Sequence, residues 1–154
     1  MTDGIVHLNV PAVLAIHREV LAAHGGGAGI RDQTLLESAV AAPQATYGGV
    51  PVMSDATEVA AAYLFYICRN HPFVDGNKRV GLGAALVFAE VNGFEVRATD
   101  DELEELTLGV ASGRIPKEEV IKFFGKRLRK SRGSRGARGR DSSGMRRGED
   151  RRKA

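Results

Sequence analysis

The sequence has only one cysteine and no apolar run of the roughly 18 residues that a membrane-spanning helix needs. One cysteine cannot form an internal disulfide, which excludes a disulfide-stapled fold and fits a reducing compartment. Cys68 lies in a strongly apolar stretch, so we expect it to pack as a small hydrophobic side chain. The start of the chain is polar and lacks the basic region of a secretory signal peptide. These absences predict a soluble, cytoplasmic protein with no membrane segment.

Charge divides the chain into two unequal parts. Residues 1–125 hold 9 Lys and Arg against 16 Asp and Glu, a net charge of −7, whereas residues 126–154 hold 13 basic and 3 acidic side chains, a net +10. We predict one folded domain over residues 1–125 and a basic, low-complexity tail over residues 126–154. The tail would contain the end of the last helix and otherwise be disordered. Its charge would allow weak contact with nucleic acid, although a solvated tail without a dedicated role fits equally well.

Helix caps and helix breakers recur through the first 125 residues. Asn9 with Pro11, and later Thr99 with Glu102, have the spacing of helix N-termini, and Gly or Pro follows most apolar helical stretches. The expected helices begin after Asn9, at Asp32, after Asp55, after Gly76, after Thr99 and at Pro116. Residues 44–53 would form a loop or a small hairpin flap, and residues 94–97 a short extended piece. Without a set of alternating strands, the predicted class is all-α, a bundle of about six helices.

Residues 71–79, His-Pro-Phe-Val-Asp-Gly-Asn-Lys-Arg, separate the two most apolar helices. Pro72 should move His71 out of helical geometry and end the preceding helix there. Phe73 should insert into the core and anchor the segment, while Gly76 permits a positive φ or a close backbone approach. A loop between core helices rarely carries so many ionisable groups unless they have a function.

The chemistry of this segment suits a polyphosphate. A helix that begins after a glycine turn offers unpaired N–H groups and the positive end of its dipole to an anion. Lys78 and Arg79 are unfavourable beside that dipole unless a bound anion supplies negative charge. Asp75 could hold a magnesium ion that bridges phosphates, Arg69 can reach the same place, and His71 is the available base. Each residue taken alone could equally be structural or solvated, but the combination favours a nucleotide site.

This segment resembles the signature of the Fic/Doc (Fido) family, in which His-Pro-Phe is followed by two residues, the second acidic, then Gly-Asn, Gly or Lys, and Arg. The resemblance to the death-on-curing (Doc-like) branch extends to residues 25–38, 43–49 and 92–94, and covers residues 5 to about 125. It implies a compact Fic/Doc helical bundle with a small flap, using ATP and Mg²⁺.

The resemblance also implies a role for each matched residue. His71 would be the general base that takes a proton from a hydroxyl of a target protein. Asp75 would bind magnesium or position that base, and Arg69 would help to hold the nucleotide. The phosphate-binding hole and the helix start would be formed by Gly76, Asn77, Lys78 and Arg79.

Two positions bear on which phosphorus atom of ATP the resemblance implies is attacked. The adenylylating branch has Gly at the position of Lys78 and a second Arg at the position of Leu82. In the death-on-curing branch, the lysine accompanies an inverted nucleotide and transfer of the γ-phosphate. Gly76, in contrast, is shared with the adenylylating branch and replaces an alanine of the phage-type member.

The implied function is that of a toxin in a type II toxin–antitoxin system. It would be a protein kinase that moves the ATP γ-phosphate to a Thr or Ser of a translation factor, with elongation factor Tu implied by the branch, and so inhibits translation. The self-inhibiting motif of many Fic enzymes is absent, because Val59 follows the spaced pair Ser54 and Glu58. Inhibition would then require a separate, Phd-like antitoxin.

Two alternatives stay open. The chain could be an adenylyltransferase that moves AMP to a hydroxyl. It could also be a non-catalytic helical binding module whose basic tail docks nucleic acid.

Overall fold

The computed structural model describes residues 4–131, and the predicted disorder of the tail beyond them lies outside the described residues. The described part is an α-helical bundle, as the sequence predicts. Its helices are α1 (Val10–His24), α2 (Gln33–Ala41), the short 3-10 helix η1 (Ala42–Gln44), α3 (Ala56–Asn70), α4 (Asn77–Val91), α5 (Asp100–Ala111) and α6 (Lys117–Arg127). Its strands are β1 (Thr46–Tyr47), β2 (Val50–Pro51), β3 (Phe94–Val96) and β4 (Leu128–Lys130).

The helices begin where side chains satisfy their first N–H groups. Hydrogen bonds confirm the predicted N-caps Asn9, Asp55 and Thr99. Asp32, expected as the first residue of its helix, is instead the N-cap of α2. Thr99 and Glu102 form a reciprocal capping box. At the start of α3, Asp55 Oδ1 accepts from Glu58 N at 2.9 Å, but no reciprocal box forms because the Glu58 carboxylate accepts from Ser54 N at 3.0 Å.

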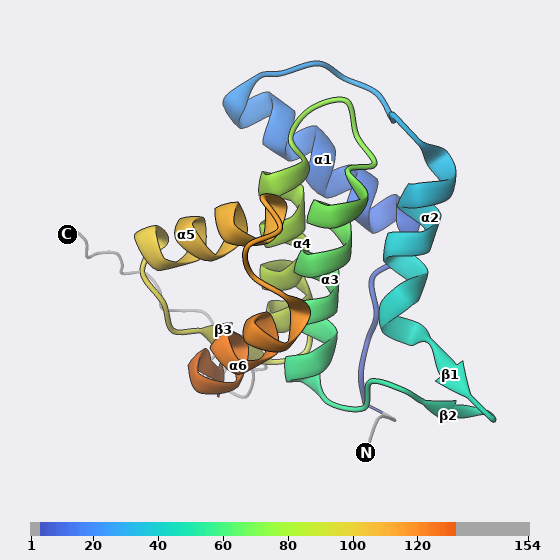
Figure 1. Cartoon of the computed structure of the whole chain (residues 1–154), viewed down its shortest axis with the longest axis vertical. Helices are drawn as coiled ribbons and strands as arrows, with labels where there is room; N and C mark the ends of the chain where they lie inside the picture. Colours follow the sequence, from blue (N-terminus) through green and yellow to red (C-terminus); the bar gives the residue numbers. More distant parts are fainter. Residues whose placement is uncertain (1–3, 132–154) are drawn as a thin grey trace, which may run out of the picture.

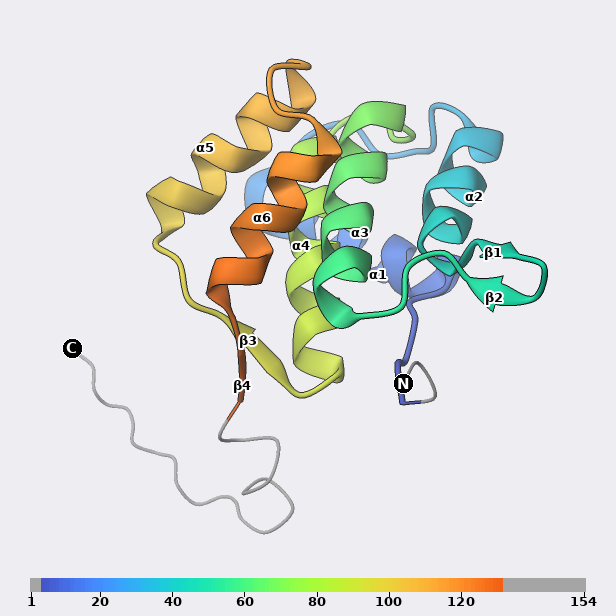
Figure 2. The same cartoon turned by 60° about the horizontal axis from the view of Figure 1, so that its bottom comes forward.

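Helix α3 is the centre of the bundle, and α2, α4, α5 and α6 all pack against it (Figures 1 and 2). Its buried residues face several neighbours at once, and Cys68 is among them, as predicted. Helix α4 lies close against α3 at Gly81, where an added Cβ would lie 2.7 Å from Cys68 Sγ. Close packing of α3 on α4 matters for function because it fixes both ends of the loop that joins them.

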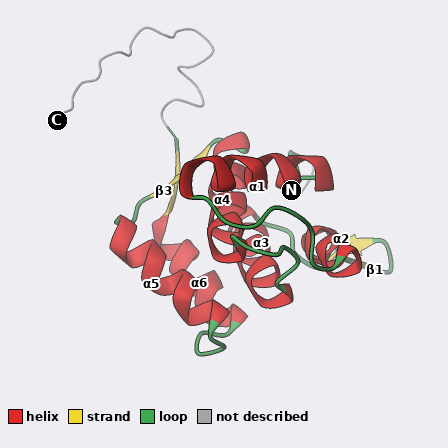
Figure 3. Cartoon of the chain, turned by 90° about the horizontal axis from the view of Figure 1, so that it is seen from above, coloured by secondary structure: helices red, strands yellow, loops and turns green. Residues whose placement is uncertain are grey.

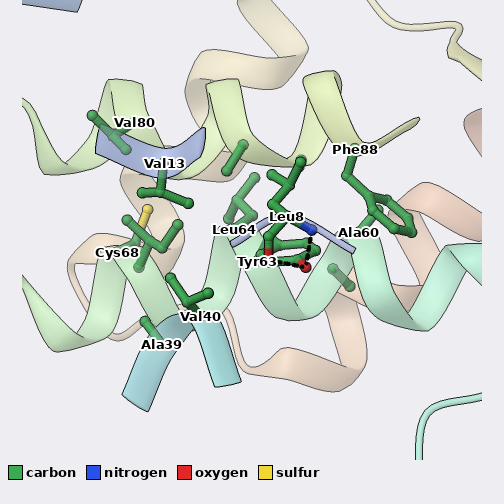
Figure 4. Close-up of a cluster of buried hydrophobic side chains, with 14 of the residues drawn as sticks. Leu8, Val13, Ala39, Val40, Ala60, Tyr63, Leu64, Cys68, Val80 and Phe88 are labelled. Atoms are coloured by element: carbon green, nitrogen blue, oxygen red, sulfur yellow. Dashed lines mark hydrogen bonds between the residues drawn. The ribbon is translucent and has the colours of Figure 1, made fainter. Parts of the chain in front are cut away.

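The N-terminal segment is tied to this centre through Tyr63 (Figure 4). The fully buried Tyr63 hydroxyl accepts from Leu8 N at 2.8 Å, and its ring lies against Phe88 with the ring centroids 5.4 Å apart. Burial raises the pKa of Tyr63 to about 12, so the hydroxyl stays protonated.

Two short antiparallel ribbons complete the fold. The predicted flap is the β1–β2 hairpin, in which Thr46 pairs with Pro51. The extended piece predicted at residues 94–97 is β3, but its partner β4 was not predicted, and Leu128, expected in the last helix, begins this strand. Pairing of β4 with β3 joins segments some 30 residues apart, which no local sequence pattern reveals. Among residues 4–131, no helix has the length and apolar character of a membrane span.

Candidate active site

Residues 71–76 form the loop between α3 and α4, here called the motif loop, at the top of Figure 1. Helix α3 ends as Pro72 predicts, but His71 adopts a left-handed conformation (φ 53°, ψ 55°) instead of an extended one. It is the single non-glycine residue with positive φ in the described part of the chain. That conformation costs of order 1–3 kcal/mol, so surrounding contacts must hold it. The His71 side chain is exposed to solvent.

Phe73 anchors the motif loop in the core, as predicted, and is fully buried. The Asn77 side chain closes the loop around it, accepting from Phe73 N at 2.8 Å and donating to Phe73 O at 2.9 Å. Asn77 is therefore buried and points away from solvent. Because both polar atoms of the Asn77 side chain bond to Phe73, an anion in front of α4 could bind Asn77 through its backbone N–H.

His17 is a part of this region that sequence reasoning missed. Its ring stacks on Phe73 with centroids 3.9 Å apart, and its Nε2 lies 3.0 Å from the Asp75 backbone oxygen. A histidine among apolar residues at helical spacing was the available signal, but its partners come from a loop some 55 residues later.

Asp75 is held from the opposite side by the glycine-rich segment that follows α1. Its Oδ2 accepts from Gly27 N at 2.6 Å. A Cβ at Gly27 would lie 3.0 Å from that oxygen, and one at Gly26 would lie 3.2 Å from the Asp75 Cβ. The glycines thus allow the backbone to reach the carboxylate. Asp75 Oδ1 has no hydrogen-bond partner within residues 4–131.

The Asp75 carboxylate fits a magnesium ion that would be bound mainly through phosphates. No cluster of three or more His, Cys, Asp or Glu side chains occurs in the described residues. Magnesium commonly uses one or two carboxylates together with substrate phosphates and water. The exposed Asp75, with one oxygen oriented by Gly27 and the other available, meets that requirement.

The start of α4 is open toward solvent. Gly76 is its N-cap with φ 86°, which confirms the predicted positive φ, and no side chain caps the helix. The N–H groups of the first helical turn have no carbonyl partner within the helix. Lys78 and Arg79 are exposed beside them, so dipole, N–H groups and two cations all favour an anion here.

A groove of about 970 Å³ runs between α1, α4 and α5 and takes in this helix start. Its lining includes the sequence-predicted residues Asp75, Gly76, Asn77, Lys78 and Arg79. Apolar lining comes from Ile16, Val20, Leu82, Leu86, Leu103 and Leu108. His71 and Arg69, also predicted for the site, do not line this groove.

Arg69 lies in the last turn of α3, exposed, and close to the turn between α5 and α6. A Cβ at Gly113, whose φ is +85°, would lie 2.9 Å from Arg69 Nη1. The absence of a side chain at Gly113 therefore leaves room for the guanidinium. The structure brings Asp75 and the residues of the α4 start together, with His71 and Arg69 at the neighbouring end of α3.

Comparison with known proteins gives concordant matches. The model of the Fic/DOC family matches residues 7–89. A Mycolicibacterium smegmatis protein named "Toxin Doc" is 46% identical over 79 residues, which make up 51% of this chain and 61% of that protein, less than two thirds of its length. A protein of Escherichia phage P1 named "Protein kinase doc" is 34% identical over 114 residues, 74% of this chain and 89% of that protein.

Proposed function

We propose that this chain, which belongs to the death-on-curing branch of the Fic/DOC family, is a toxin of a type II toxin–antitoxin system that acts as a protein kinase. It transfers the γ-phosphate of ATP to a Thr or Ser hydroxyl of a translation factor and thereby inhibits translation in the cytoplasm. The observation that carries the proposal is the uncapped start of α4, where Lys78 and Arg79 stand beside the oriented carboxylate of Asp75.

The proposed roles follow from the position of each group. The β- and γ-phosphates lie against the first N–H groups of α4 and the side chains of Lys78 and Arg79. Arg69 contacts the nucleotide from the end of α3. Asp75 would hold Mg²⁺, and the ion would supply positive charge against the phosphates.

In the proposed reaction, the target hydroxyl oxygen attacks the γ-phosphorus and its proton passes to His71. The bond between the γ-phosphorus and the bridging oxygen breaks, and ADP leaves with that oxygen. Such a transfer depends mainly on positioning and on charge stabilisation, which the hydrogen-bonded motif loop and the helix start would supply.

Transfer of the γ-phosphate is favoured by where the cations lie. Cations must face the place where negative charge develops in the transition state. Lys78 puts a cation at the helix start, whereas Leu82, one turn further along the groove, is apolar. An adenylyltransferase needs the opposite arrangement, with space at the helix start and a cation for the outer phosphates beyond it.

A separate antitoxin, proposed to be Phd-like, would control the activity. Glu58, the acid with the spacing of the self-inhibiting motif, bonds to Ser54 at the start of α3. The motif loop follows the end of this 15-residue helix, roughly 20 Å away at 1.5 Å per residue. Glu58 therefore cannot reach the phosphate site, and inhibition in cis by this residue is excluded.

The proposal is tested with ATP labelled separately at the α and γ phosphorus and a cell lysate as the source of target. Wild-type protein should pass the γ label to a protein the size of elongation factor Tu. His71→Ala should reduce the rate by about 10²- to 10⁴-fold while keeping its fold, because it lacks the general base. Val74→Ala, an exposed position in the same loop, is the matched control and should stay active.

The two alternatives give different outcomes in this assay. Transfer of the α label would identify an adenylyltransferase. No His71-dependent transfer of either label would leave a binding module, and a His71→Ala protein with wild-type turnover would contradict the proposed mechanism.

A further inference from the structure

We infer that Arg31 is a positioning residue that holds the proposed base, His71, in its left-handed backbone conformation. The inference concerns the same site and rests on the proposed function for its catalytic consequence. Arg31 lies outside the motif loop, in the segment of residues 25–32 that joins α1 to α2, here called the strap. Strap and motif loop cross the same end of the bundle (Figures 1 and 3).

The Arg31 side chain binds the end of α3 through two different nitrogens. Its Nε donates to His71 O at 2.6 Å, and its Nη2 donates to Asn70 O at 3.0 Å. Carbonyls at a helix C-terminus lack partners within the helix and carry the negative end of its dipole. A guanidinium suits them because its N–H groups point in fixed, diverging directions.

The remainder of the motif loop is held by backbone groups of the strap. The N–H groups of Arg31 and Asp32 both donate to Pro72 O, at 2.6 and 3.0 Å, and Val74 N donates to Gly29 O at 3.1 Å. These bonds do not involve the Arg31 side chain. Truncating that side chain should therefore release the peptide after His71 while Pro72 to Asp75 stay in place.

His71 needs such a restraint more than its neighbours do. Its backbone is in a region that costs of order 1–3 kcal/mol for a non-glycine residue. Its imidazole is exposed and has no hydrogen bond within residues 4–131, so backbone geometry sets the direction in which the ring projects. Relaxation toward an extended conformation would turn the base away from the attacking hydroxyl.

The expected kinetic signature is a loss in turnover without a loss in nucleotide binding. Displacement of a reacting group by about 1 Å can reduce a rate by ~10²-fold. The helix start and Asp75, which contact the nucleotide in the proposed site, keep their own supports. Arg31→Ala should therefore lower kcat by about 10- to 100-fold and leave KM for ATP within about 2-fold.

The test uses the full chain with Arg31→Ala, Arg31→Lys and the control Arg18→Ala, which removes an exposed arginine from α1. Arg31→Lys keeps the charge but cannot donate to both carbonyls in the same geometry, so it should recover only part of kcat. Arg18→Ala should match the wild type. A second readout needs no substrate: the NMR signals of the His71 imidazole should shift in Arg31→Ala and stay unchanged in Arg18→Ala.

Two results would overturn the inference. The first is an Arg31→Ala protein with wild-type kcat and an unchanged His71 NMR signal. The second is a parallel loss of ATP binding and melting temperature in Arg31→Ala and Arg31→Lys, because that loss would show a merely structural role. Its failure is distinct from failure of the proposed function. If His71→Ala is inactive and Arg31→Ala is fully active, only the role of Arg31 falls. If His71→Ala is itself active, the proposed mechanism falls, and the NMR signal still reports whether Arg31 holds His71.

Discussion

Single hydrogen-bonding groups, from side chains and from the backbone, decide how the motif loop presents its chemistry. Asn77 closes the loop around Phe73, Gly27 orients Asp75, and Arg31 binds the carbonyl of His71. The sequence pointed to the groups that we propose to contact a substrate, because His71, Asp75 and Lys78 belong to one contiguous motif. It did not reveal the supporting residues His17 and Arg31, whose partners lie some 40 to 60 positions further along the chain. Their contacts depend on how helices pack, which a local pattern does not encode.

His7, which lies outside the candidate active site, should make the free energy of unfolding depend on pH. Burial lowers the pKa of His7, whose Nδ1 is buried without a hydrogen-bond partner in the described part of the chain. Between the lowered folded pKa and the unfolded value of 6.5, the unfolded state binds more protons, so stability falls as pH decreases through this window.

His7→Phe removes this proton uptake and should make the urea unfolding midpoint fall less between pH 8 and pH 5 than it does in the wild type. An equal fall in both proteins would show that His7 is not the group responsible.

At the scale of elements, the close contact of α3 with α4 supports the motif loop from both ends. Gly81→Ala places a Cβ 2.7 Å from Cys68 Sγ and 3.2 Å from Leu64 O. Overpacking of this kind typically costs about 1–3 kcal/mol. The measurement is the free energy of unfolding from urea titration.

The matched control is the same substitution in a helix with free space. A Cβ at Gly125 in α6 would meet no atom closer than Thr57 Cγ2 at 3.8 Å. Gly125→Ala should therefore stabilise the protein by about 0.5–1 kcal/mol, because alanine loses less backbone entropy in a helix. If Gly81→Ala and Gly125→Ala changed the free energy of unfolding in the same direction, the close packing of α3 on α4 would not be the cause.

Helices whose ends are marked by capping residues or glycine turns could be predicted from the sequence. A strand that forms only by pairing with a distant segment could not. The Asn9 and Thr99 caps and the glycine turn at Gly76 located helix starts to within a residue. Strand β4 was hidden because Leu128 to Lys130 lie in a basic stretch predicted to be the end of the last helix and the tail, and because β4 pairs with β3, some 30 residues earlier.

For the whole molecule, the folded unit should end at Ser131, whose N–H donates to Gly93 O at 2.8 Å. A chain cut after Ser131 should melt at the full-length temperature, because the composition of residues 132–154 offers almost nothing to bury.

A chain cut after Arg127 also lacks β4 and should melt lower. A loss of ~1 kcal/mol would lower Tm by roughly 3–6 °C in a domain of this size. The test is to compare thermal unfolding of the full chain, the chain cut after Ser131 and the chain cut after Arg127. A lower Tm after the first cut would contradict the boundary, as would an unchanged Tm after the second.

The proposed activity of the whole molecule is transfer of a γ-phosphoryl group to a protein hydroxyl. The most direct measurement is the intact mass of purified elongation factor Tu after incubation with the full chain, Mg²⁺ and unlabelled ATP, with His71→Ala as the negative control. We expect elongation factor Tu to gain one phosphoryl group with release of ADP, and to gain nothing with His71→Ala. A gain of AMP would contradict the proposed activity.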